Sequence, residues 1–300
     1  MEKMMAMLQT ETPGSKHTKL DRYPVDQLVN AFIDDQFDAV TAVRAASAQL
    51  ARAVDAAAAR LIEGGRLIYV GAGTSGRLGL LDSVELYPTF SWPRERAIAL
   101  LAGGSQAVYQ AIEGAEDNLE QGAADIAALH PEALDVVLLL AASGSTPYVM
   151  GALAAARQAG ALTIGIANNP TAPLTLQAEI GITLDTGAEL ISGSTRLKAG
   201  TAQKIALNTF SSSVMVRLNK VYGNLMVDLK PTNAKLMRRS IALTMLATGV
   251  TEDAAKAMLE QSGYQVKVAI VALKKELDPD LARQLLERSQ GSVRLTLADQ

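Results

Sequence analysis

The sequence predicts an α/β protein with a parallel sheet that helices cover on both faces. Apolar runs typical of buried strands occur at 66–70, 97–101, 136–141, 162–166 and 180–184. Helical patterns separate these runs, at 78–85, 105–112 and 148–158. Strands that alternate with helices in this way predict parallel pairing through right-handed crossovers.

Helices are also expected before and after the sheet. Apolar residues recur at helical spacing over 38–62 and again over about 195–218. Beyond Pro231 the pattern is helical throughout, at 233–246, 251–261, 266–274 and 279–288. We therefore expect an amino-terminal helical segment at 1–60, a sheet domain at 61–230 and a small helical region at 231–300.

The composition favours an enzyme that acts on small molecules. With 28 basic and 31 acidic residues the net charge is −3, which lacks the positive field that nucleic-acid binding needs. There is no cysteine, and the two histidines suggest neither a catalytic base nor a metal site. The sequence shows no signal peptide and no long apolar run, so we expect no membrane partner and a cytoplasmic location.

A glycine-rich loop follows the first predicted strand. Gly71, Gly73 and Gly76 have the G-x-G-x-x-G spacing of a dinucleotide-binding loop. Such a loop also requires an acidic residue at the tip of the second strand, and here that strand runs into "LAGG". This difference counts against NAD.

Hydroxyl side chains favour a single phosphate instead. Thr74 and Ser75 follow the first strand, and the third strand runs into "AASGSTP", with Ser143, Ser145 and Thr146. Hydroxyls and free N–H groups at helix starts suit a phosphate monoester. Serine and threonine are also the preferred residues at ordinary helix N-caps. The residues alone therefore leave both phosphate binding and simple helix capping open.

Longer motifs resemble a known family. The stretches "GAGTSGRLGLLDSVE", "EGAEDN", "AASGSTPYV", "GSTRLKAGTAQK", "KVYGNLMVDL" and "TNAKL" are similar to those of N-acetylmuramic acid 6-phosphate etherases. The resemblance runs from about residue 20 to the carboxyl-terminal helices, which are similar to the family's ubiquitin-associated-like tail. It implies a three-layer parallel sheet of the sugar isomerase (SIS) type.

The resemblance also implies a reaction, in which the lactyl ether of the sugar phosphate is eliminated and water adds back. The family needs no metal or organic cofactor and forms homodimers. Its proton donor corresponds to Glu85 and its second catalytic glutamate, the expected base, to Glu116. A donor must stay protonated at neutral pH, and we expect Leu86, Tyr87 and Phe90 to give Glu85 an apolar setting. Without the resemblance, Glu116 would be taken for part of a solvated acidic run.

The remaining site residues follow from the same resemblance. The expected phosphate and sugar contacts are Thr74, Ser75, Gly76, Ser143, Ser145, Thr146, Glu189, Ser194, Arg196 and Lys198. The chain departs from the family pattern at Leu86 and Tyr87, where cysteine and proline are usual, and at Ser145, where arginine is common. These departures put substrate affinity in question more than the type of reaction.

The sequence leaves open how Glu85 reaches the substrate and which of three functions the chain has. One straight helix would place Ser75 and Glu85 about 15 Å apart, farther than the sugar reaches, so either the helix ends early or a dimer completes the site. We favour the dimer. The alternative functions are a sugar-phosphate isomerase of the same fold and a sugar-phosphate sensor that does no chemistry.

Overall fold

The computed structural model describes residues 8–231 and 233–298. The chain divides into two compact units. The first consists of Met1–Ser83 and Glu95–Ser211, and the second of Val84–Arg94 and Ser212–Gln300. Within the described residues, no helix is both long and apolar enough to cross a membrane.

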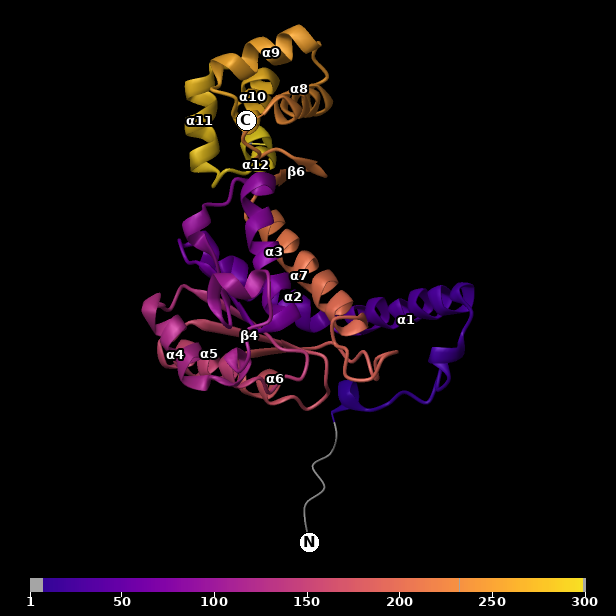
Figure 1. The fold of residues 1–300 in the computed structure, drawn as a ribbon. Helices are drawn as coiled ribbons and strands as arrows, with labels where there is room; N and C mark the ends of the chain where they lie inside the picture. Colours follow the sequence, from indigo (N-terminus) through magenta and orange to yellow (C-terminus); the bar gives the residue numbers. More distant parts are fainter. Residues whose placement is uncertain (1–7, 232, 299–300) are drawn as a thin grey trace. The chain divides into compact units, whose positions relative to one another are not determined.

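A five-stranded parallel sheet forms the centre of the first unit (Figure 1). Its strands lie in the order β2-β1-β3-β4-β5. Their bounds are β1 Leu67–Gly71, β2 Ala97–Leu101, β3 Val136–Leu140, β4 Leu162–Ala167 and β5 Ile180–Thr183. All five strands that the apolar runs predicted are confirmed, and the inner strands β1, β3 and β4 are buried along their whole length.

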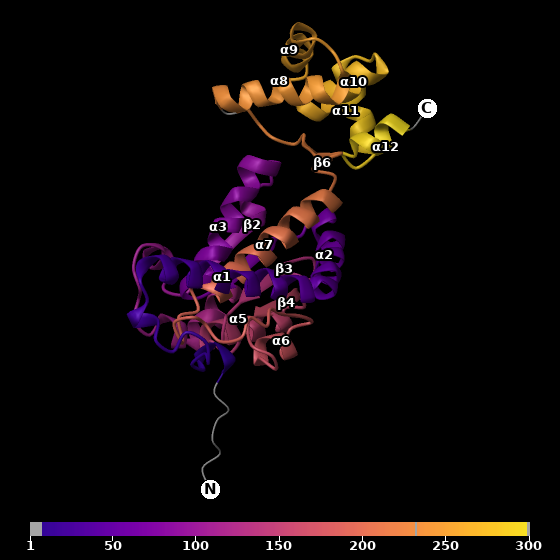
Figure 2. The ribbon, with the colours of Figure 1, turned by 90° about the vertical axis from the view of Figure 1, so that its right-hand side faces the viewer.

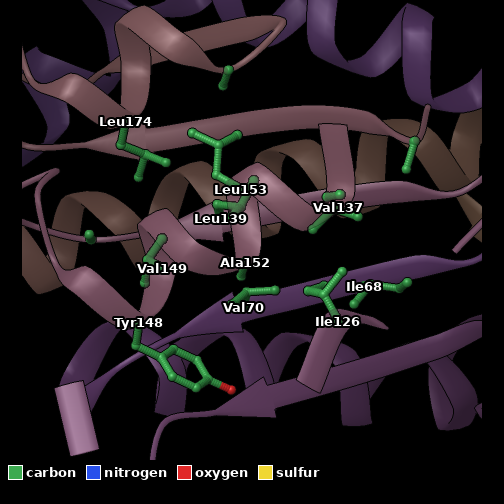
Figure 3. Packing of buried hydrophobic residues seen from close by; sticks show 14 of the residues in the cluster. Ile68, Val70, Ile126, Val137, Leu139, Tyr148, Val149, Ala152, Leu153 and Leu174 are labelled. Atoms are coloured by element: carbon green, nitrogen blue, oxygen red, sulfur yellow. The ribbon is translucent and has the colours of Figure 1, made fainter. Parts of the chain in front are cut away.

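Helices cover both faces of this sheet and complete three layers. On one face lie α4 (Leu119–Ala128), α5 (Pro147–Gln158) and α6 (Pro173–Gln177), and α2 (Ser47–Ile62) packs on the other, as Figure 2 shows from the side. Figure 3 shows a core cluster of this unit, in which Leu139 of β3 lies next to Leu153 of α5. The three-layer parallel sheet expected from the resemblance is thereby confirmed.

Two helix predictions in this unit were wrong, and two helices were not predicted. The single helix at 38–62 is two helices, α1 (Val25–Ala45) and α2, which meet at Ala46. The segment 105–112 is not a helix but a short 3-10 turn, η4 (Gly104–Val108), followed by turns. Helices α4 and α6 were not predicted. The other 3-10 turns are η1 Gln9–Glu11, η2 Leu20–Arg22, η3 Arg94–Arg96 and η5 Ala115–Asp117.

Two long helices, α3 (Gly73–Phe90) and α7 (Lys198–Arg217), follow polar loops and are joined by a buried carboxylate. Asp82 of α3 is buried and accepts hydrogen bonds from Tyr69 Oη at 2.8 Å, Asn208 Nδ2 at 2.7 Å and Ser211 Oγ at 3.1 Å. Burial raises the pKa of Tyr69 well above its usual value, and the nearby Asp82 acts in the same direction. The network ties β1, α3 and α7 together.

The second unit holds a separate helical core. Its helices are α8 Ala234–Thr248, α9 Glu252–Gln261, α10 Val266–Lys275, α11 Pro279–Arg288 and α12 Val293–Ala298. Leu259, Val271 and Leu286 are among the buried residues of this core. The predicted carboxyl-terminal helices are confirmed, whereas a hairpin of β6 (Val221–Tyr222) and β7 (Leu225–Met226) was not expected.

Candidate active site

The strand order of the first unit creates a place for a ligand. From β1 the chain passes to β2 on one side and then to β3 on the other, so the loops after β1 and β3 leave the sheet in opposite directions. Open parallel sheets bind ligands outside the carboxyl ends of strands at such a point. Gly71 and Leu140, the last residues of the two strands, are register partners, so both loops start at the same level.

A cavity of about 410 Å³ lies between these two loops, and we call it the strand-end cavity. Its lining consists of Glu11, Ala72, Gly73, Thr74, Ser75, Glu116, Asp117, Ala141, Ala142, Ser143, Ser145, Thr146, Pro147, Gly193 and Thr195. Six of the residues expected to bind or react with the substrate therefore come together: Thr74, Ser75, Ser143, Ser145, Thr146 and Glu116.

The three glycines of the first loop are required by the backbone conformation and by close packing. A Cβ on Gly71 would lie 2.7 Å from the nitrogen of Gly76, and one on Gly76 would lie 2.6 Å from the oxygen of Gly71, so these two glycines let the strand and helix pack closely. Gly73 has φ +52°, which a side chain would strain. Gly76 does not line the strand-end cavity, and its contact with the phosphate stays a prediction.

Both loops present hydroxyls at the start of a helix. Thr74 and Ser75 lie in the first turn of α3. In the second loop, Ser143 Oγ accepts a hydrogen bond from the backbone N–H of Ser145 at 3.2 Å and lies 3.4 Å from Thr146 Oγ1. The side chain of Thr146 does not cap α5, which begins at Pro147 directly after this loop. Two helix amino termini and these hydroxyls suit an anion.

Glu116 lies in η5 and is exposed. It lines the strand-end cavity and also a neighbouring cavity of about 270 Å³, which shares Ala72 and Gly73 with it. Arg77 of α3 lines this second cavity and holds the preceding segment, because its guanidinium donates to the backbone oxygens of residues 107, 108 and 110 at 3.0–3.3 Å. A carboxylate at this position can reach a small molecule in the strand-end cavity.

Sequence reasoning missed three polar residues that line the cavity: Glu11, Asp117 and Thr195. Glu11 comes from the amino-terminal segment, which the buried side chain of Asn169 holds in place. Asn169 Oδ1 accepts a hydrogen bond from the backbone N–H of Thr10 at 3.2 Å, and Asn169 Nδ2 donates to the backbone oxygen of Ala142 at 2.8 Å. No local sequence pattern predicts the contact between Asn169 and Thr10, because the two residues are far apart in the sequence.

The lining of the strand-end cavity carries three carboxylates, on Glu11, Glu116 and Asp117, and none of its residues in the described chain is lysine, arginine or histidine. A phosphate bound here would be held by hydroxyls and N–H groups alone. The exchange of arginine for Ser145 is consistent with this lack of cations. No group of three or more described His, Cys, Asp or Glu side chains has an arrangement that could hold a metal ion.

Glu85 lies on α3 within the second unit and is exposed. The apolar setting expected for it is absent: Leu86 is buried, but Glu85 itself faces outward. Because α3 is one helix from Gly73 to Phe90, the early helix end considered above is wrong. By helical rise, Ser75 and Glu85 are about 15 Å apart along that helix.

Glu189 and Lys198 are buried and already have partners. The carboxylate of Glu189 accepts from the backbone N–H groups of Lys198 at 3.1 Å and Ala199 at 2.9 Å, which caps α7. Lys198 Nζ lies 2.8 Å from Asp35 Oδ1 and 3.1 Å from Asp38 Oδ2 of α1. Both residues line a separate cavity of about 300 Å³ and not the strand-end cavity, and their contact with the substrate stays a prediction.

The pKa shifts of this second cluster follow from burial. Burial raises the pKa of Glu189, and the two backbone hydrogen bonds partly oppose this. Burial alone would lower the pKa of Lys198, but hydrogen bonds and charges from Asp35 and Asp38 outweigh it and raise that pKa. Ser194 and Arg196 line neither cavity, and Arg196 is exposed.

Comparisons with known proteins agree with this architecture. Residues 49–157 match the family model described as "Glucokinase regulatory protein N-terminal SIS domain". The chain is 55% identical over 290 residues to an N-acetylmuramic acid 6-phosphate etherase of Deinococcus radiodurans, covering 97% of this chain and 95% of that relative. It is 46% identical to the same-named protein of Salmonella choleraesuis, covering 98% and 99%. A phosphoheptose isomerase structure from Francisella tularensis covers 65% of this chain and 100% of its own, with a TM-score of 0.50 and 17% identity, a likeness of fold alone.

Proposed function

This chain belongs to the N-acetylmuramic acid 6-phosphate etherase family, and we propose that it cleaves the lactyl ether of N-acetylmuramic acid 6-phosphate, a carbon–oxygen lyase reaction that gives N-acetylglucosamine 6-phosphate and D-lactate. The observation that carries this proposal is the strand-end cavity, where two hydroxyl-bearing helix starts face the carboxylate of Glu116. The first feature suits a sugar phosphate, and the second suits proton transfer beside it.

In the proposed reaction the phosphate of the substrate is held by Thr74, Ser75, Ser143 and Thr146. In the open-chain aldehyde the proton alpha to the carbonyl is acidic, and Glu116 removes it as a general base. The freed electron pair forms a carbon–carbon double bond while the beta carbon–oxygen bond breaks. A general acid, assigned to Glu85, protonates the departing lactyl oxygen. Water then adds to the unsaturated aldehyde and restores a hydroxyl group at that carbon.

We further propose that a homodimer completes the site. The strand-end cavity lacks a cation among its described lining, and Glu85 is too far along α3 from Ser75 to act on the same sugar. Helix α1 extends beyond the sheet in Figure 1 and has one exposed apolar face, which we call the α1 stripe. It consists of Val25, Val29, Ile33, Phe37 and Val40. An exposed face of this kind marks an interaction site, and a second copy presents the same face to it.

Sedimentation velocity tests the dimer. Phe37→Glu places a charge in the α1 stripe, so we expect its dimer dissociation constant to rise at least tenfold and lactate release to fall with it. The matched control is Gln27→Glu, an exposed position on the opposite face of α1, which should sediment as the wild type does. A monomeric wild-type protein with full activity would contradict the proposal.

The alternative functions differ in what they release. A sugar-phosphate isomerase would move the proton to the adjacent carbon and release nothing, and a sensor would bind the sugar phosphate unchanged.

The cytoplasmic location and the domain limits at residues 60 and 230 stay predictions.

An assay of D-lactate separates these functions. Purified protein with N-acetylmuramic acid 6-phosphate should release one D-lactate per sugar and, in heavy water, place deuterium alpha to the aldehyde carbon. Proton exchange without lactate would indicate the isomerase. Bound, intact substrate with no exchange would indicate the sensor.

A further inference from the structure

The second unit contains a cavity of about 810 Å³ that the proposed reaction does not use, and we call it the tail cavity. Its charged lining is formed by Lys220, Lys230, Lys267, Arg283, Asp228 and Glu287. Four cationic side chains therefore face two carboxylates. Every residue of the lining belongs to the second unit.

Two lysines of this cavity share one carboxylate. Lys220 Nζ lies 2.7 Å and Lys267 Nζ 2.9 Å from the same oxygen, Oδ2 of Asp228. Only 12% of the Lys267 side chain and 21% of the Lys220 side chain are exposed. Burial lowers the pKa of Lys267, the charge of Asp228 opposes this, and the charge of Lys220 adds to the lowering. One positive charge of the pair thus lacks a counter-charge in a largely desolvated place.

Further hydrogen-bond donors belong to residues that line the same cavity. Helix α10 starts there with Val266, and no side chain caps it. Ser91, another lining residue, has a buried hydroxyl that finds no partner among the described residues, and its backbone is held at φ +50°. A buried hydroxyl without a partner, on a residue in an unusual conformation, is a feature that functional sites show.

We propose that the tail cavity binds a small phosphate monoester. The phosphate would lie between Lys220 and Lys267, which supply the charge that Asp228 alone cannot balance, and would accept from the free N–H groups of α10 and from the Ser91 hydroxyl. Phosphate suits the site better than a carboxylate because its three terminal oxygens can serve the lysines, the helix start and the hydroxyl together. Val227 and Leu286 provide an apolar wall for the organic part of the ligand.

The fluorescence of a tryptophan in the second unit can report ligand binding in the tail cavity. It has a single tryptophan, Trp92, which is buried in the second unit with Lys220 Nζ 6.0 Å from its ring centroid. We expect the tryptophan fluorescence of the full chain to change saturably with inorganic phosphate or glycerol phosphate, at an ionic strength held constant with sodium chloride. Acetate should need at least a tenfold higher concentration. A change that follows ionic strength alone, or an acetate response equal to that of phosphate, would overturn the proposal.

Substitutions locate the response. Lys220→Gln and Lys267→Gln should each weaken phosphate binding at least tenfold, whereas Lys256→Gln, which removes an exposed lysine paired with Glu252, should leave it unchanged. If Lys267→Gln does not fold, Lys220→Gln alone decides. Ser143→Ala, in the strand-end cavity, should keep the fluorescence response. Loss of the fluorescence response in Ser143→Ala would overturn the assignment to the tail cavity. Wild-type phosphate binding by both lysine variants would overturn it as well.

Discussion

The first unit has two polar clusters at the ends of its strands and helices, and the resemblance assigned substrate contacts to both. In the strand-end cavity, Thr74 and Glu116 face open space. In the cluster at the start of α7, Glu189 caps a helix and Lys198 pairs with two aspartates. The difference shows that residues which satisfy one another inside the fold hold the scaffold, while similar residues left without fold partners are the ones that can meet a ligand.

The largest expected effect falls on Glu116. Glu116→Gln removes the proposed base but keeps the size of the side chain, so turnover in the D-lactate assay should fall about 10²–10⁴-fold with substrate still bound. Glu120→Gln is the matched control, since it lies in the same acidic run but outside the cavity, and it should retain wild-type turnover. Equal loss of turnover in both variants would show that Glu116 has no special role as the base.

Next comes the cluster at α7, where stability rather than turnover should change. Lys198→Met leaves the largely buried Asp35 without its partner, and such a loss costs about 3 kcal/mol in the free energy of unfolding. Lys204→Met, at an exposed position of the same helix, should cost under about 0.5 kcal/mol. Chemical denaturation measures both. If Lys198→Met instead raised KM strongly with unchanged stability, Lys198 would belong to the substrate site.

A smaller effect is expected from a single hydroxyl of the loop after β3. Ser143→Ala removes one donor to a charged group, worth about 1.5 kcal/mol, so kcat/KM should fall about tenfold, mostly through KM. Thr175→Ala removes a hydroxyl that bonds only within its own turn, to the oxygen of Ala172, and should change kcat/KM less than twofold. Initial rates over a range of substrate concentrations compare the two variants.

The smallest effect concerns pH. The pKa of Lys198 is raised in the folded chain, so its ion pairs stabilise the fold fully below the usual lysine pKa of 10.5 and lose that contribution as pH rises through the folded value. The difference in melting temperature between wild type and Lys198→Met should therefore stay constant from pH 7 to 9 and shrink above about pH 10.5. A difference that vanished near neutral pH would contradict the assignment.

The sequence predicted the sheet and the two hydroxyl-bearing loops after β1 and β3 because those features are local. Continuous apolar runs mark buried strands, and Thr74 and Ser143 directly follow them. The break at Ala46 went unseen because no glycine or proline interrupts the alanine-rich helix pattern there. Glu11 was missed for a different reason: its place in the cavity depends on Asn169, which holds segments far apart in the chain together.

A crystal structure of Glu116→Gln with N-acetylmuramic acid 6-phosphate would show where the substrate phosphate binds, because this variant should bind the substrate without turning it over. We expect the phosphate in the strand-end cavity, within hydrogen-bond distance of Thr74 or Ser75 and of Ser143. A phosphate beside Lys198 in the cluster at α7 would contradict the account.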